Sequence, residues 1–144
     1  MKEKPPLTSE AEVLAEELHE IVSAFIRNVR ISTGTIRTSQ YETLDLLDTH
    51  HALSIAELAS LRGVKHQSMR LVINELELQG LVQRQKNPQD ARAQLIVLSE
   101  NARALLADAR AKRVEWIAAR LDTRLSEAER GDLQKGLAAL HKLL

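Results

Sequence analysis

One stretch decides the fold: "SIAELASLRGVKHQSMRLVINELELQGLVQR", residues 54–84. Ser54 is placed to cap a short helix that stops at Gly63, because Ser favours the N-terminus of a helix and Gly its end. A second helix, from His66, carries an apolar stripe and ends at Gly80. Two short helices joined by a few residues around a glycine are typical of a helix-turn-helix.

A β-hairpin is predicted directly after these helices. Residues 81–86 and 93–98 alternate or run apolar on either side of "NPQD" at 87–90. Apolar runs bounded by Asn, Pro and Asp indicate two strands, here joined by a loop of about four to six residues. Near the tip of this hairpin stands Arg92, two residues after Asp90.

Long amphipathic helices are predicted on both sides of this core. One spans 9–30 and begins with a capping box of Ser9 and Glu12, a shorter one starts near Ser39, and two more follow the hairpin. The predicted fold class is mainly α with a small β-hairpin wing (α+β), a winged helix-turn-helix between long terminal helices. The expected divisions of the chain are a leader and a long helix (1–37), a lobe with the helix-turn-helix and the hairpin (38–100), and long C-terminal helices (101–144).

Composition narrows the function classes. Twenty Lys and Arg balance twenty Asp and Glu, so overall charge points to no partner. Residues 62–92, however, hold six basic and three acidic residues, a net charge of +3 that can mark a nucleic-acid-facing segment. The chain has no cysteine, and we expect neither a thiol-based sensor nor a metal or other cofactor. It shows no signal core and no long apolar stretch, so we expect a cytoplasmic protein without membrane contact.

The second helix has the polarity that a DNA-reading helix needs. Short polar and basic side chains come first, where they can reach base edges, and apolar ones form the inner face. Gln67 suits an adenine, Arg70 a guanine or a phosphate, and Ser68 a phosphate. A surface helix with a polar end remains the alternative. The candidate major-groove residues are Lys65, His66, Gln67, Ser68 and Arg70.

The hairpin strengthens the nucleic-acid interpretation. Arg92 on a stiff loop can enter the narrow, electronegative minor groove. Asp90 is no phosphate contact, but it can hold the Arg92 guanidinium or the loop backbone in place. An exposed turn without function is the alternative. The candidate wing residues are Arg84, Lys86, Asp90 and Arg92.

Residues 39–106 resemble the winged helix-turn-helix core of the multiple-antibiotic-resistance regulator (MarR) family. The resemblance rests on the stretch at 54–84 with its "LQGLV" step, and on "DARAQLIVLSENARALL" at 90–106. The second segment is similar to the family's wing signature of Asp, any residue and Arg, followed by a strand, Leu, and Ser or Thr. The long flanking helices resemble the family's dimerisation helices by pattern.

The resemblance implies a homodimer that binds pseudo-palindromic double-stranded DNA as a transcription regulator, usually a repressor, often released by a small-molecule effector or an oxidant. By position, residues 66–70 would read the major groove and Arg92 the minor groove, with Asp90 positioning the wing. Two features depart from the family pattern. Ala102 replaces a usual Gly at the joint between the wing strand and the next helix. Three glutamines dilute the commonly basic wing, which implies weaker phosphate contacts or a restricted site preference: Gln83, Gln85 and Gln89.

Other classes find less support in the sequence. The pair His50 and His51 with His66 lacks the spacing of a metal site. No nucleophile elbow or glycine-rich phosphate loop identifies an active site, so we expect no enzyme. Trp116 is expected to pack in the core or the dimer rather than to hold a ligand. The main rival from another class is a winged helix that docks on a protein and never reads DNA, which the zero net charge and the glutamine-rich wing favour.

Overall fold

The computed structural model describes residues 9–35 and 38–144, in two compact units. The winged unit spans Ile36–Lys112. The terminal unit combines Met1–Thr35 with Arg113–Leu144. Within residues 9–35 and 38–144, no helix has both the length and the apolar character needed to cross a membrane.

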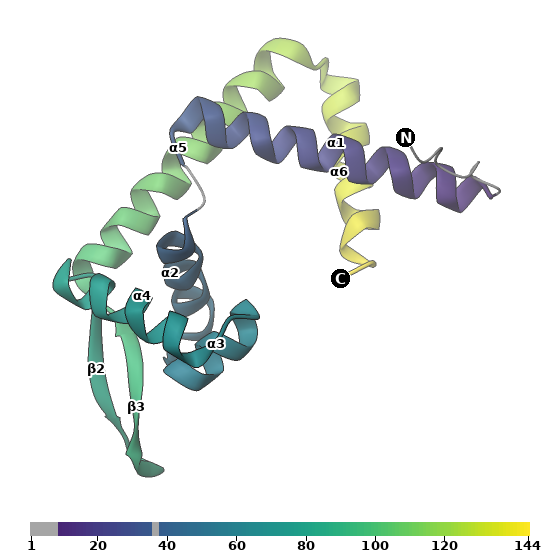
Figure 1. Ribbon diagram of the computed structural model, residues 1–144. Coiled ribbons are helices and arrows are strands. Elements are labelled where there is room, and N and C mark those ends of the chain that lie inside the picture. The colour runs from purple at the N-terminus through teal and green to yellow at the C-terminus, as the bar shows by residue number, and fades with distance from the viewer. Residues whose placement is uncertain (1–8, 36–37) are drawn as a thin grey trace, which may run out of the picture. The chain divides into compact units, whose positions relative to one another are not determined.

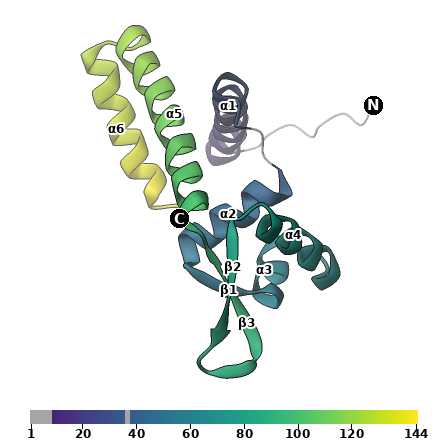
Figure 2. The ribbon, with the colours of Figure 1, turned by 90° about the vertical axis from the view of Figure 1, so that its left-hand side faces the viewer.

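The winged unit is a helix-turn-helix with a three-stranded sheet (Figures 1 and 2). The strands are antiparallel in the order β1-β3-β2. The fold class predicted from the sequence is confirmed. In chain order the elements are α2 (Ser39–His50), β1 (Ala52–Ser54), α3 (Ile55–Arg62), α4 (His66–Leu78), β2 (Val82–Asn87), β3 (Asp90–Leu98) and the first turns of α5 (Glu100–Arg124).

Local signals account for the bounds of α3 and α4. The Ser54 side chain accepts a hydrogen bond from the Glu57 backbone N–H, and the Glu57 carboxylate accepts one from the Ser54 N–H, which completes a capping box. Gly63 ends α3 with a φ of 63°, and Gly80 follows α4 with a φ of 71°. Glycine adopts this left-handed conformation at no steric cost, so both predicted stops are confirmed.

Strand β1 was not anticipated from the sequence. It has only three residues, Ala52–Ser54, and it pairs with β3 so that Leu53 lies opposite Ile96. Three residues are too few to show a strand pattern, and the pairing partner lies more than forty positions away in the chain. The strand pairs with the edge of β3 that is not bonded to β2.

The wing turn is tighter than predicted. Only residues 88 and 89 form the turn, and β3 begins at Asp90. The expected longer loop appears instead as an irregularity in the pairing. Lys86 lies opposite Gln94 and Asn87 opposite Asp90, so residues 91–93 have no counterpart on β2. Such an insertion bends a strand and redirects its side chains, and here it contains Arg92.

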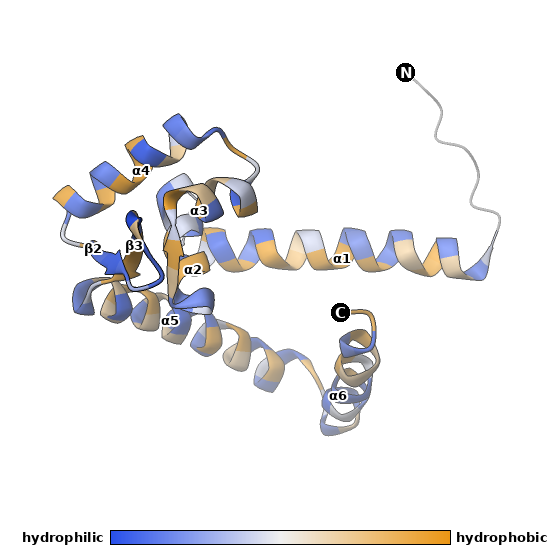
Figure 3. Ribbon diagram, turned by 90° about the horizontal axis from the view of Figure 1, so that it is seen from below, coloured by the Kyte–Doolittle hydropathy of each residue, from blue (hydrophilic) through white to orange (hydrophobic). Residues whose placement is uncertain are grey.

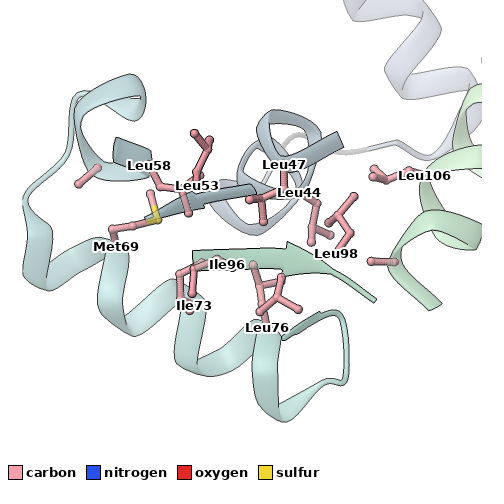
Figure 4. Close-up of a cluster of buried hydrophobic side chains, with 13 residues drawn as sticks. Leu44, Leu47, Leu53, Leu58, Met69, Ile73, Leu76, Ile96, Leu98 and Leu106 are labelled. Atoms are coloured by element: carbon pink, nitrogen blue, oxygen red, sulfur yellow. The ribbon is translucent and has the colours of Figure 1, made fainter. Parts of the chain in front are cut away.

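The core of the winged unit anchors α4 (Figure 4). Met69, Ile73 and Leu76 on its inner face have no exposed surface, and they meet Leu58 and Ile96 in one cluster. The burial of each such side chain contributes about 1.5–3 kcal/mol. The inner face of α4 is thus fixed, which leaves its outer face to solvent.

Ser99 joins the end of α4 to the start of α5. Its hydroxyl donates to the Gly80 carbonyl oxygen at 2.7 Å and accepts from the Ala102 backbone N–H at 3.1 Å. Ala102 is fully buried, and with Leu106 it belongs to the core of the winged unit. The joint is therefore closed and well packed with Ala where the family pattern has Gly. The winged unit continues past the predicted boundary at residue 100.

The terminal unit consists of α1 (Glu10–Thr33), the last turns of α5 and α6 (Glu127–His141). Apolar residues recur along the whole of α1 (Figure 3). The Trp116 and Phe25 rings lie 6.4 Å apart between centroids, and the Arg120 guanidinium lies over the Trp116 ring, 3.7 Å from its centroid. Many large apolar side chains of this unit are exposed in the single chain: Val13, Leu14, Ile21, Val22, Phe25, Ile26, Ile31, Val114, Leu133, Leu137, Leu143 and Leu144.

Candidate nucleic-acid interface

The start of α4 presents the polar residues that the sequence predicts for base contacts. Lys65 is the N-cap residue and makes no capping hydrogen bond with its side chain. All five candidate residues are exposed. Met69, which lies between them in the sequence, is buried in the core. The candidates are Lys65, His66, Gln67, Ser68 and Arg70.

Helix α2 supports α3 and α4 through its first turn. The Gln40 Nε2 amide donates to Glu75 Oε2 of α4 at 2.6 Å. Arg62 at the end of α3 forms an ion pair with Glu42 and donates to the Ser39 hydroxyl at 3.3 Å. These contacts hold α3 and α4 on α2 without using any of the candidate DNA-binding side chains.

Two Asx turns, one at Asn87 and one at Asp90, hold the wing tip. The Arg92 backbone N–H donates to Asp90 Oδ1 at 3.0 Å, and the Gln89 N–H donates to Asn87 Oδ1 at 3.0 Å. Of the two roles considered for Asp90, the structure shows the backbone bond. Lys86 and Arg92 are exposed, and neither forms an ion pair within the described part of the chain. Their charges are available to an external anion.

Arg84 differs from the other wing cations because its guanidinium is bound within the protein. Its Nε donates to Glu77 Oε2 at 2.6 Å, and its Nη2 donates to Asn74 Oδ1 at 2.7 Å. A longer bond of 3.4 Å joins Nη1 to Gln94 Oε1 on β3. Arg84 therefore connects both wing strands with the outer face of α4.

A groove of about 440 Å³ lies between the start of α3, the outer face of α4 and the wing. Four of its ten lining residues carry the cationic or titratable side chains His66, Arg70, Arg84 and Arg92, and no lining residue is acidic. Both Figures 1 and 2 show the β2–β3 hairpin projecting beyond the helices next to this region. Because Glu77 pairs with Arg84, the net positive charge of the groove comes from Arg70 and Arg92. A concave surface of this charge favours a polyanion.

The groove unites part of each predicted residue set. His66 and Arg70 of α4 line the groove, and so do Arg84 and Arg92 of the wing. The remaining candidates lie outside its lining: Lys65, Gln67, Ser68, Lys86 and Asp90.

Sequence reasoning missed the three partners of Arg84, which are Asn74, Glu77 and Gln94. A signal for two of them was present. Asn74 and Glu77 follow His66 and Arg70 at helical spacings of four, four and three residues, which places all four on one stripe of α4. The spacing by itself does not say that the wing covers the second half of that stripe.

Comparison with known proteins identifies the family. Residues 36–93 match the model of the MarR family. An uncharacterized helix-turn-helix (HTH)-type transcriptional regulator of Mycobacterium bovis is 35% identical over 123 residues, covering 84% of this chain and 85% of the relative.

Solved structures share the fold over nearly the whole chain. A Pseudomonas aeruginosa protein superimposes with a TM-score of 0.83 at 27% identity, covering 95% of this chain and 97% of the other. A structure of the multiple antibiotic resistance repressor, MarR, gives a TM-score of 0.71 with 96% of each chain covered. At 19% identity, the second likeness concerns the fold alone.

Proposed function

Because the chain belongs to the MarR family of helix-turn-helix transcriptional regulators, we propose that it binds pseudo-palindromic operator DNA as a homodimer and represses transcription. The observation that carries the proposal is the cationic groove between α4 and the wing, which no acidic side chain lines. Such a regulator acts in the cytoplasm, where it meets chromosomal DNA, and it needs no catalytic residue or cofactor.

In this proposal α4 enters the major groove by its N-terminal turns. Gln67, Ser68 and Arg70 contact base edges, since amide and guanidinium groups pair with adenine and guanine in that groove. Lys65 and His66 contact the backbone beside them. The first amides of α4 receive no side-chain cap from Lys65, so a phosphate oxygen can accept from them at the positive end of the helix.

The wing provides the second contact. Arg92, in the irregular part of β3, enters the minor groove, and Lys86 neutralises a phosphate. Asp90 touches no DNA and acts by holding the Arg92 backbone. Most of the affinity then comes from charges on the backbone, whereas the few base contacts of α4 give the sequence preference.

The terminal unit provides the dimer. Its exposed apolar side chains lie on α1, α5 and α6, and large exposed apolar patches mark interaction sites. A second copy of the same chain covers them around a two-fold axis, which places the two recognition helices about 34–36 Å apart, one turn of DNA.

Release by a small-molecule effector fits the same arrangement. A ligand shifts the dimer away from DNA only if it binds one spacing of the two lobes better than the other. Thiol oxidation is not the signal here, because the chain has no cysteine.

The proposal is tested by fluorescence anisotropy on the DNA upstream of the protein's own gene and on scrambled DNA of equal length, at three salt concentrations. We expect binding to the upstream DNA to be tighter by about a thousandfold or more, with a negative log–log salt slope. The Arg92→Glu variant should lose affinity for both duplexes. The Arg110→Glu variant, altered by the same charge at an exposed position of α5 outside the groove lining, serves as the control.

The outcomes separate the candidate functions. Loss of affinity and a shallower salt slope for Arg92→Glu alone support the DNA interface. If the wild type binds neither duplex, selection from random-sequence DNA follows, and failure there refutes the proposal and favours a protein-docking winged helix. An Arg92→Glu variant that binds like the wild type excludes the wing as part of the interface.

A further inference from the structure

Arg84 has the position of a wing cation but the contacts of an internal bridge. Its guanidinium uses three nitrogens on three acceptors, two on α4 and one on β3, while its own backbone belongs to β2. Only 27% of its side chain is exposed. A phosphate contact would have to compete with the short bonds to Glu77 and Asn74.

The bridge depends on the shape of arginine. A guanidinium offers five N–H donors in one rigid plane, so Nε and Nη2 can serve two acceptors in a fixed relative orientation. A lysine ammonium carries the same charge but no such plane. Lysine at position 84 can therefore pair with Glu77, but it cannot also fix the direction of β2 relative to α4.

The bridge acts on the stripe of α4 that faces the groove. Asn74 and Glu77 occupy its second half, and His66 and Arg70 occupy its first half. On β2, Lys86 follows Arg84 at the two-residue spacing that returns to the same face of the strand. Arg84 also bonds to Gln94 of β3, the strand that carries Arg92. The bridge therefore joins α4, which carries the side chains proposed for the major groove, to both strands of the wing.

Charge gives the bridge a second effect. Glu77 lies on the outer face of α4, where an unpaired carboxylate would repel a phosphate backbone. Arg84 neutralises this carboxylate, with 2.6 Å between Arg84 Nε and Glu77 Oε2. The positive charge of Arg84 is thus used within the protein.

We propose that Arg84 is a positioning residue that sets the angle between the wing and the recognition helix through Glu77 and Asn74. This inference rests on the proposed function, because that angle decides whether Arg92 and Arg70 engage neighbouring grooves of one duplex. It assigns to Arg84 a role different from that of Lys86 and Arg92, which supply charge to the DNA.

The first arm of the test needs no DNA. Amide hydrogen exchange of the β2–β3 hairpin is compared in the wild type, Arg84→Lys and Arg84→Gln, with Lys86→Gln as the matched control on the same strand. We expect both Arg84 variants to speed exchange at residues 82–98 by about tenfold, because a local opening no longer breaks charge-assisted bonds. Lys86→Gln should exchange like the wild type. Unchanged exchange in both Arg84 variants overturns the proposal, and a thermal melt verifies that each variant is folded.

The second arm measures affinity and salt slope on a duplex selected with the wild-type protein. We expect Arg84→Lys to bind about tenfold more weakly with an unchanged salt slope, since the lysine still neutralises Glu77 and every phosphate keeps its cation. Arg84→Gln should bind at least as weakly, because it also leaves the Glu77 carboxylate unpaired. Lys86→Gln should make the slope shallower by about 0.9, the value for one neutralised phosphate. A lysine that restores binding, together with a shallower slope for Arg84→Gln, would make Arg84 a phosphate ligand and refute the inference.

Glu77→Gln completes a double-mutant cycle. If Arg84 acts through Glu77, Arg84→Gln should cost little affinity for the duplex in a protein that already carries Glu77→Gln. A direct bond from Arg84 to a phosphate predicts the same loss in both backgrounds. If the wild type selects no duplex, the proposed function fails, and the exchange arm still decides whether Arg84 holds the wing.

Discussion

Replacing Ser99 by alanine should weaken the joint between α4 and α5. The hydroxyl makes two hydrogen bonds, from Ala102 N–H and to the Gly80 carbonyl, and the residue is only 8% exposed. Loss of a helix N-cap costs about 1 kcal/mol. The Gly80 carbonyl also loses its donor, and because Gly80 is exposed, water can partly replace it, which adds about 1 kcal/mol. The expected loss is therefore about 2 kcal/mol.

A matched control exists at the start of α6. Ser126 caps that helix through the Glu129 N–H but donates to no distant carbonyl in the described part of the chain. We expect Ser126→Ala to cost about 1 kcal/mol, half the value for Ser99→Ala. Ser99→Thr keeps the hydroxyl and should lie within about 0.5 kcal/mol of the wild type.

The assay is urea unfolding followed by circular dichroism, with every variant at the same protomer concentration, since a dimer makes the apparent stability concentration-dependent. The slope of free energy against urea must stay constant for the midpoints to be compared. Equal losses for Ser99→Ala and Ser126→Ala would show that the Gly80 bond contributes nothing. A loss below about 0.5 kcal/mol for Ser99→Ala would refute the closed joint altogether.

Two further predictions concern packing. Ala102→Gly introduces the residue that is usual in the family pattern. In the same urea assay it should destabilise the protein by about 1–2 kcal/mol, because glycine has a lower helix propensity and a buried methyl group is lost. Equal stability of the variant and the wild type would mean that the methyl group packs poorly. The proposed dimer is tested by the double change Leu133→Asp and Leu137→Asp, which should give a monomer in analytical ultracentrifugation because two charges would enter the apolar face. Gln134→Asp on the same helix should leave the proposed dimer intact. A double variant that is still dimeric would exclude α6 from the interface.

Part of the candidate interface was predictable because its signals are local. The exposed residues at the start of α4 follow from one helical stripe of apolar anchors, and Arg92 follows from a turn signal. The bond from the Arg92 N–H to Asp90 is equally local, since two residues separate its partners. Sequence reasoning offered this bond as one of two options. Which of the two options forms depends on the backbone conformation of residues 91–93, and their irregular pairing depends on the opposite strand.

The internal contacts of Arg84 were not predictable in this way. As a cation on a predicted wing strand it looked equivalent to Lys86. Its partners Glu77 and Asn74 lie seven and ten residues before it. Whether they meet depends on the corner at Gly80, which folds β2 back along α4.

By itself, the sequence determined the helices, their ends and the polar face of α4, because capping boxes, glycine stops and the helical period act over three or four neighbouring residues. Only the tertiary structure decided that Ala52–Ser54 is a strand, that the joint at Ser99 is closed, and that the charge of Arg84 is used inside the protein. Each of these depends on the approach of segments that are separate in the chain. That approach is set by the packing of the common core around Met69, Ile73 and Ile96 and has no short-range signature.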